Sequence, residues 1–289
     1  MKSAIRIAAL LLLLPLAACS PKKDANQAQD AQPKSQEQTA TQVAAPPTQD
    51  TAAGNAAPEA PQPAAPVAGM VHDPSNPPVD CPLRKQGLDP TKMKPFEQIE
   101  AYIQFLDRED RAIWQKPLEV VDAMQLKGNE RVLDLGAGSG YFSFPIAQRL
   151  TSGRLFAADV EPEMIRHIHH NAMLKGVQNI EVRIIDPQAP QIPENIDVVF
   201  MCDVMHHIAN PVEWMSGIAK QLPDGAQFHI IEFKQGDIPD GPPEQAKIAP
   251  EKLVETAQAA GFQLARRVDG LLPYQYYYVF EKTAAQPHT

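Results

Sequence analysis

The chain has 289 residues, a formal net charge of −9 at pH 7 and three cysteines. This length is enough for one large domain or two small ones. The acidic balance and the lack of a Lys/Arg run in the expected folded part argue against a nucleic-acid partner.

The N-terminal end, residues 1–18, predicts a bacterial lipoprotein signal peptide. Basic residues precede the apolar run Ile7 to Leu14, and small residues lead to Cys19. The run is shorter than the roughly 20 residues of a transmembrane helix, and small residues before a cysteine suit cleavage followed by lipid attachment. We expect an exported chain, anchored through a lipid on Cys19 at the periplasmic side of a membrane. Ser20 follows Cys19 at the position where an aspartate would resemble an inner-membrane retention signal, so the sequence favours the outer membrane.

Residues 19–78 predict a disordered linker. They are rich in Ala, Pro and Gln, and the first aromatic side chain of the chain is Phe96. Such a composition buries too little apolar surface to offset the entropy of ordering. Residues 79–289 are expected to form the folded domain. With Cys19 acylated, Cys81 and Cys202 remain, and a semi-buried thiol is favoured over a disulfide between them.

After residue 96, helix-like and strand-like segments alternate, which is typical of an α/β fold with a mostly parallel sheet. The expected strands are Arg131–Leu135, Arg154–Asp159, Ile180–Ile185, Ile196–Met201, Gln227–Phe233, Phe262–Val268 and Tyr274–Glu281. The expected helices between them are Tyr141–Leu150, Glu163–Lys175, Pro211–Gln221 and Pro250–Ala260, and apolar residues at helical spacing predict further helices between Phe96 and Met124. The linker between the last two strands is too short for a parallel crossover, so they should pair antiparallel.

A glycine-rich loop follows the first expected strand, with Gly136, Gly138 and Gly140 at alternate positions after Asp134. Glycines let a ligand approach the backbone, tolerate positive φ and leave free N–H groups at a helix N-terminus. The spacing Gly-x-Gly-x-Gly differs from the Gly-x-Gly-x-x-Gly of dinucleotide-binding loops. Together with the preceding acid, it favours S-adenosylmethionine over NAD.

Seven strands ending in an antiparallel hairpin, with this loop after the first, resemble the class I S-adenosylmethionine-dependent methyltransferases of small-molecule type, from about Phe96 to Lys282. The resemblance implies a seven-stranded, mostly parallel Rossmann-like α/β sheet with helices on both faces. It also implies S-adenosyl-L-methionine as cofactor and methyl transfer to a small or lipid-like acceptor, which these residues do not identify.

The same resemblance assigns the cofactor contacts. Asp134 and the loop amides would meet the methionine end. Asp159, before Val160, would accept hydrogen bonds from the ribose hydroxyls, or cap the next helix. Asp186 would meet the adenine amino group, or open an Asp-Pro turn. The expected cofactor-binding residues are Asp134, Gly136, Gly138, Gly140, Asp159, Val160, Asp186 and Asp203.

Asp203 and His206, which follow the fourth expected strand, are the expected catalytic residues. Asp203 is placed nearest the sulfonium. Transfer requires aligned reactants, with a base where the acceptor loses a proton. His206 is either that base or a histidine packed against the following helix. Glu232 either contacts the acceptor or is solvated or salt-bridged, and the loop from Gln235 to Pro243 should border the acceptor pocket.

Two other clusters have alternative interpretations. His167, His169 and His170 share one expected helix, and a spacing of three could bind a metal. No metal site is expected, because no carboxylate or cysteine completes the ligand set. Arg111 and Trp114 could fold over the cofactor, or form an ordinary salt bridge and core anchor.

The predicted export conflicts with a cofactor that is made and used in the cytoplasm. One alternative is therefore a catalytically silent lipoprotein that uses the same fold to bind a nucleoside-type ligand or a partner. Others are that cofactor reaches that compartment or that the anchored domain faces inward. The complete set of loop glycines and strand-end acids favours cofactor binding, and the glycine spacing disfavours an NAD-dependent oxidoreductase.

Overall fold

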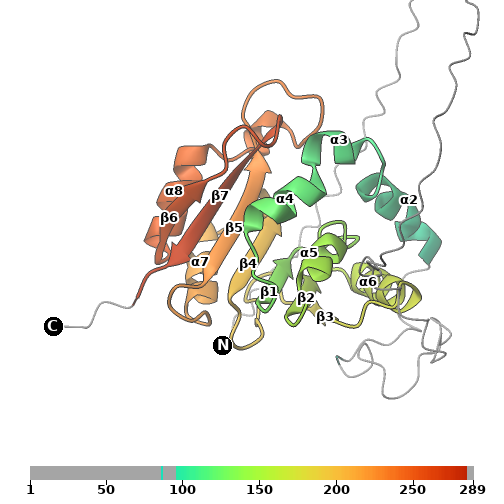
Figure 1. The fold of residues 1–289 in the computed structure, drawn as a ribbon. Coiled ribbons are helices and arrows are strands. Elements are labelled where there is room, and N and C mark those ends of the chain that lie inside the picture. The colour runs from blue at the N-terminus through green and yellow to red at the C-terminus, as the bar shows by residue number, and fades with distance from the viewer. Residues whose placement is uncertain (1–85, 87–95, 285–289) are drawn as a thin grey trace, which may run out of the picture. The chain divides into compact units, whose positions relative to one another are not determined.

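The computed structural model describes Gln86 and residues 96–284. The predicted signal peptide and linker, with Cys19 and Cys81, lie outside the described residues. From residue 96 on, the chain folds around one mixed sheet flanked by helices (Figure 1).

The sheet has seven strands in the order β3-β2-β1-β4-β5-β7-β6. Their bounds are β1 Arg131–Leu135, β2 Arg154–Asp159, β3 Ile180–Ile184, β4 Val198–Cys202, β5 Gln227–Phe233, β6 Phe262–Arg267 and β7 Gln275–Lys282. Strands β1 to β5 are parallel, whereas β7 lies between β5 and β6 and runs antiparallel to both. Strand order reverses between β1 and β4, and open α/β sheets bind ligands beyond the carboxyl ends of the strands at such a point.

Helices cover both faces of this sheet. Their bounds are α2 Phe96–Leu106, α3 Arg111–Gln115, α4 Pro117–Met124, α5 Ser143–Arg149, α6 Pro162–Leu174, α7 Pro211–Ala219 and α8 Pro250–Ala259, with short 3-10 helices η2 Met205–His207 and η3 Glu244–Ala246. Helices α4, α6, α7 and α8 each begin with a proline, whose fixed φ and missing N–H suit a first turn.

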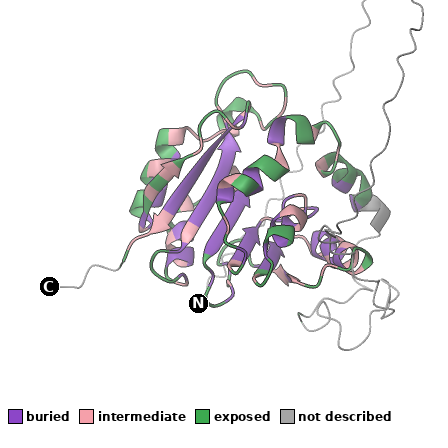
Figure 2. Ribbon diagram, viewed as in Figure 1, coloured by how far each residue is buried: buried purple, intermediate pink, exposed green. Residues whose placement is uncertain are grey.

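The strands carry the core, and their alternating side chains supply both faces of the sheet. Leu133 and Leu135 of β1 belong to a cluster with Leu253 of α8, while Val132 packs in another with Ile146 of α5. Figure 2 shows the central strands as the most buried part of the fold. The carboxyl ends of β1 and β4 are thereby held by packing from both sides.

The predicted fold class is confirmed, and the expected strands and the four helices between them end within two residues of the observed ones. Helix α3 was not expected as a separate short helix within the N-terminal helical region. Lys116 has φ 45° and ends α3, and Pro117 begins α4. Among the described helices, none has the length and apolar composition needed to cross a membrane.

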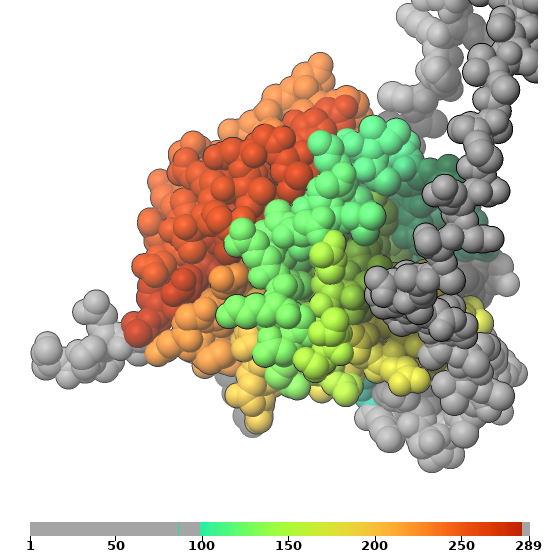
Figure 3. All heavy atoms as spheres, viewed as in Figure 1, coloured from blue at the N-terminus to red at the C-terminus, as the bar shows by residue number. Residues whose placement is uncertain are grey.

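Segment α3–α4 lies against the C-terminal β6–β7 part of the surface (Figure 3). The ammonium of Lys116 donates to the carbonyl of Leu271 at 2.9 Å, and the guanidinium of Arg266 donates to the carbonyl of Ala123 at 2.7 Å. These contacts fix the N-terminal helices next to the carboxyl edge of the sheet.

Candidate functional site

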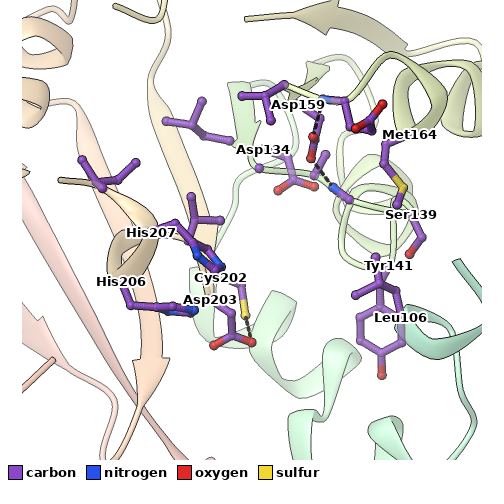
Figure 4. Close-up of a pocket in the computed structure, with 18 of the residues that line it drawn as sticks. Leu106, Asp134, Ser139, Tyr141, Asp159, Met164, Cys202, Asp203, His206 and His207 are labelled. Carbon is purple, nitrogen blue, oxygen red and sulfur yellow. Dashed lines mark hydrogen bonds between the residues drawn. The ribbon is translucent and has the colours of Figure 1, made fainter. Parts of the chain in front are cut away.

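A cavity of about 970 Å³ opens at the carboxyl ends of β1, β2 and β4. Helices α2 and α3 contribute Leu106, Arg111 and other side chains to its lining. Figure 4 shows Asp134 and Asp159 on one side of this space and Asp203 with His206 on the other. The residues that the sequence analysis assigned to ligand and chemistry therefore meet, with the exceptions described below.

The loop after β1 needs its glycines for two reasons. Gly136 and Gly138 line the cavity and have φ of 80° and 55°, in the left-handed region. A Cβ on Gly136 would lie 2.4 Å from Cγ2 of Val204, so only glycine lets this loop approach the segment after β4.

The loop amides are used differently from the expectation that they face a ligand. The N–H groups of Gly136 and Ala137 donate to the carbonyl of Ala158 at 2.8 and 3.0 Å. Gly140 does not line the cavity, and its N–H donates to the carbonyl of Ala137. Backbone pairing with β2 therefore shapes the loop and leaves a glycine surface towards the cavity.

Asp159 ends β2 and holds two backbone amides. Its Oδ2 accepts from Gly138 N–H at 2.8 Å, and its Oδ1 accepts from Glu161 N–H at 2.9 Å. Burial raises the pKa of Asp159, and these amides partly offset that rise. Each carboxylate oxygen keeps a further lone pair for a ligand hydroxyl. Val160, next in the chain, is 51% exposed and lines the cavity with an apolar surface.

Asp134 lies deeper, at the base of the loop. The hydroxyl of Ser143 donates to its Oδ2 at 2.5 Å. Burial raises the pKa of Asp134 to about 7, the Ser143 hydrogen bond lowers it, and the charge of Asp159 adds to the rise. The carboxyl group therefore titrates near neutrality in the wall of the cavity.

Asp203 follows β4 with φ 60°, and two glutamine amides hold its carboxylate. Gln275 Nε2 donates to Oδ1 at 2.6 Å, and Gln115 Nε2 donates to Oδ2 at 2.9 Å. Burial and the charge of Glu232 raise the pKa of Asp203 to about 6, although Arg111 and the two amides lower it. The side chain is thus fixed in one orientation at the cavity.

His206 and Glu232 form a buried pair beside Asp203. The ring Nδ1 of His206 lies 2.8 Å from Oε2 of Glu232, and the backbone N–H of His206 donates to Oε1 of Glu232 at 3.3 Å. Burial alone would lower the pKa of His206, but the hydrogen bond and charge of Glu232 raise it above its usual value. Glu232 thus sits behind the imidazole and does not line the cavity, so the geometry supports the salt-bridge interpretation of this residue rather than the acceptor contact.

Residues before and inside α3 form another part of the cavity wall. Arg108 donates from Nη2 to Oδ1 of Asp240 at 2.7 Å and joins the start of α3 to the loop after β5. The guanidinium of Arg111 lies 4.2 Å from the ring centre of Tyr141. Trp114 packs on Phe233 with ring centres 6.1 Å apart. These cationic and aromatic groups surround the space in front of the His206–Glu232 pair.

A sequence model of the methyltransferase domain matches residues 126–282, more than half of the chain. The chain belongs to this methyltransferase family. Its sheet, with β7 antiparallel between β5 and β6, is that of a class I S-adenosylmethionine-dependent methyltransferase.

Curated relatives of this methyltransferase match it over part of its length. It is 29% identical over 140 residues to the aklanonic acid methyltransferase DauC of Streptomyces sp. (strain C5), covering 47% of this chain and 64% of that protein. It is 24% identical over 211 residues to the ubiquinone biosynthesis O-methyltransferase of Aeromonas salmonicida (strain A449), covering 64% of this chain and 85% of that protein. The chain thus spans just under two thirds of the first relative.

Solved structures share the fold. A SAM-dependent methyltransferase from Aquifex aeolicus superposes with a TM-score of 0.59 at 24% identity, over 62% of this chain and 96% of that one. The [4+2]-cyclase SpnF superposes with a TM-score of 0.50 at 15% identity, over 59% of this chain and 81% of that one. Because a cyclase has the same fold, the reaction has to be argued from the site.

S-adenosyl-L-methionine is the cofactor of this methyltransferase. The residues present fit it: a Cβ on Gly136 would close the loop against Val204, and the carboxylates of Asp134, Asp159 and Asp203, which all line the cavity, suit a molecule with a cationic ammonium and sulfonium.

Asp186 lies outside the cavity that it was expected to reach. It is exposed, and its Oδ1 accepts from the N–H of Gln188 at 2.8 Å, as in a turn opened by Asp-Pro. Ile185, Pro187 and Gln188 line the cavity instead. The turn interpretation, which the sequence left open, is the one that the geometry supports.

The histidines of α6 and the described cysteine have local roles. His167 Nε2 lies 2.8 Å from Nδ2 of Asn171, and within the described ranges no group of three or more His, Cys, Asp or Glu could hold a metal ion. Cys202 is a free thiol, and burial raises its pKa well above the usual value. It lines the cavity next to Asp203.

Sequence reasoning missed Gln115 and Gln275, which hold Asp203. Gln115 is fully buried at the end of α3, a helix that was not expected as a separate element. Gln275 begins β7 and pairs with Phe233 at the end of β5, a register that depends on where β7 inserts. The sequence offered one signal for these two residues: each glutamine lies next to an aromatic residue at the end of a helix or strand.

Proposed function

We propose that this methyltransferase transfers a methyl group to an ionisable oxygen of a small or lipid-like acceptor. The observation that carries the proposal is the His206–Glu232 pair at the cavity wall next to Asp203. Methyl transfer to a hydroxyl oxygen requires that its proton leave, so a base at this position has a defined task.

The cofactor would lie between the glycine loop and the end of β2. Asp159 would accept from the ribose hydroxyls and Val160 would support the adenine. Asp134 would face the ammonium and Asp203 the sulfur. Bound S-adenosyl-L-methionine supplies an electrophilic methyl group on a positively charged sulfur. The protein then has to align the acceptor with it and exclude water.

His206 would accept the acceptor proton at Nε2, because Nδ1 is held by Glu232. The carboxylate fixes the ring and stabilises the imidazolium that forms, as its effect on the pKa of His206 indicates. Proton removal raises the nucleophilicity of the acceptor oxygen. The front of this space is lined by Trp114, Phe233 and Arg108, which suit a planar, partly anionic acceptor.

The curated relatives support a small-molecule acceptor. Two of them are named for aklanonic acid methylation and for the O-methylation step of ubiquinone biosynthesis. Both names imply small organic acceptors, and the second states an oxygen acceptor. The aromatic wall of this cavity agrees with that class, which favours an enzyme over a silent binding protein.

We further propose that a lipid on Cys19 tethers the domain to the membrane after export, as the N-terminal sequence indicates. A tether of about 60 residues would let the domain reach acceptors in or near the lipid surface. Cell fractionation and alkynyl fatty-acid labelling of wild-type and Cys19→Ser chains test this directly. Labelling that persists in Cys19→Ser would contradict it.

The activity is tested by transfer of labelled methyl from S-adenosyl-L-methionine to a panel of phenols, quinols and amines. We expect phenolic or quinolic oxygens to be methylated, with loss of transfer in His206→Gln. Methylation of amines with full activity in His206→Gln would overturn the oxygen assignment.

A further inference from the structure

A second cavity, of about 240 Å³, is lined by residues of η2 and the loop after it, by the first residue of α7, and by α8 with the segment just before it. It shares His206, Ile208 and Ala209 with the main cavity. The residue placed as the base therefore borders both spaces. A ligand group at His206 is within reach of either one.

The second cavity has an apolar lining. Its lining includes Met205 and Leu253, which are only 1% and 0% exposed to solvent, and Ile248. The Thr256 hydroxyl is occupied, since it donates to the carbonyl of Lys252 at 2.8 Å. The Lys252 ammonium lies 3.3 Å from Glu255 on side chains that are 69% and 67% exposed. The cation is thus at the solvent edge, and the interior suits hydrocarbon.

We propose that the second cavity holds an apolar tail of the methyl acceptor, whose hydroxyl head lies at His206 in the main cavity. The proposal deepens and rests on the function proposed above. Separate ligand sites usually measure roughly 300–1,000 Å³, and this cavity of about 240 Å³ is smaller. It adjoins the main cavity at three shared lining residues, a position that suits one part of a longer ligand.

The acceptor class is therefore an amphiphile: an aromatic or similarly ionisable hydroxyl head that carries a hydrocarbon chain. Head and chain would part at Ile208 and Ala209, the two apolar residues common to both cavities. A short, tail-free phenol would fill only the head position. Each methylene of a chain that leaves water adds affinity, about fourfold per buried CH₂.

The test is calorimetric titration of the full chain with phenol, 4-butylphenol and 4-hexylphenol, without cofactor. We expect affinity to rise at least tenfold from phenol to 4-hexylphenol. Thr256→Met, which fills the cavity from α8, should remove most of that gain and leave the affinity for phenol near its wild-type value. Ile248→Phe fills the same space from another segment and serves if Thr256→Met does not fold.

The matched control is Gln258→Met, the same introduced side chain at an exposed position of α8, which should keep the full gain. Equal affinity for all three phenols overturns the proposal, as does a gain that survives in both filled variants, because the chain then binds elsewhere. These titrations measure binding alone. A chain that does not transfer methyl groups can therefore still show or lack the tail site, and the two failures are distinguishable.

Discussion

The Nδ1 of His206 lies 2.8 Å from Oε2 of Glu232, although 26 residues separate the two in the chain. Their side chains are 6% and 1% exposed. Strand β5 ends beside the segment after β4, and this adjacency places Glu232 where its carboxylate can orient His206, the base that we propose.

His206→Gln should lower the rate of methyl transfer to an oxygen acceptor by roughly 10²–10⁴-fold, the usual contribution of a general base. Cofactor affinity should change little, because the base acts on the acceptor. Glu232→Gln should lower the rate less and shift the pH–rate profile, since the imidazole loses the charge that raises its pKa. Rates and cofactor dissociation constants measured in parallel check this.

The adjacent His207 supplies the control for that experiment. His207 is exposed at the end of η2, and partial burial of its ring together with the charge of the neighbouring His206 lowers its pKa. His207→Gln should therefore keep most of the activity. Equal losses in the two variants would indicate that the segment as a whole was disturbed and that no specific base had been removed.

Gly136→Ala should weaken cofactor binding and reduce stability. The added Cβ would meet Val204 Cγ2 at 2.4 Å, and alanine at φ 80° is strained by about 1–2 kcal/mol. Adding Val204→Ala removes the clash but not the strain, so it should restore part of the stability. Thermal melting of the single and double variants separates the cost of the clash from the cost of the backbone strain. A double variant no more stable than Gly136→Ala would refute the close-packing explanation.

Cofactor affinity should increase with pH between about 5 and 8. Burial raises the pKa of Asp134 to about 7 and that of Asp203 to about 6, so both carboxyl groups become ionised across this window. A cationic sulfonium gains from that charge, whereas S-adenosylhomocysteine, with a neutral sulfur, gains less. We expect a rise on the order of tenfold, which corresponds to about one pKa unit of coupling.

Titrations of both ligands at several pH values test this sign. Asp203→Asn should reduce the dependence for S-adenosyl-L-methionine to that for S-adenosylhomocysteine, because Asp134 still titrates, and should leave the dependence for S-adenosylhomocysteine almost unchanged. Affinity that falls as pH rises would contradict the assignment of the carboxylates to the cationic end.

The sequence predicted the fold and much of the site because both depend on local patterns. Strand periodicity and the glycine loop after β1 depend on residues close in the chain, and acids at strand ends meet at one edge of a parallel sheet. The roles of Glu232, Gln275 and Asp186 depend on register and turn geometry. Side-chain direction at a strand end changes with a shift of one residue, so spacing could not decide whether Glu232 faces the acceptor or His206.

The contact between Arg108 and Asp240 should matter for acceptor binding. Asp240→Asn removes the charge that holds the start of α3 against the loop after β5, where the two atoms lie 2.7 Å apart. Both side chains are partly exposed, so a few-fold rise in acceptor KM is expected, with cofactor affinity unchanged. Asp237→Asn, on an exposed position of the same loop, is the control. A rise in KM of equal size in the control would point to a general effect of loop charge.

The most direct test of the account is calorimetric titration of the wild-type and Asp159→Ala chains with S-adenosyl-L-methionine, S-adenosylhomocysteine and NAD. The account predicts that both sulfur nucleosides bind the wild type, that NAD does not, and that Asp159→Ala weakens the two by about tenfold or more, as expected for lost charge-assisted hydrogen bonds. Absence of binding by either nucleoside, or unchanged affinity in Asp159→Ala, would contradict it.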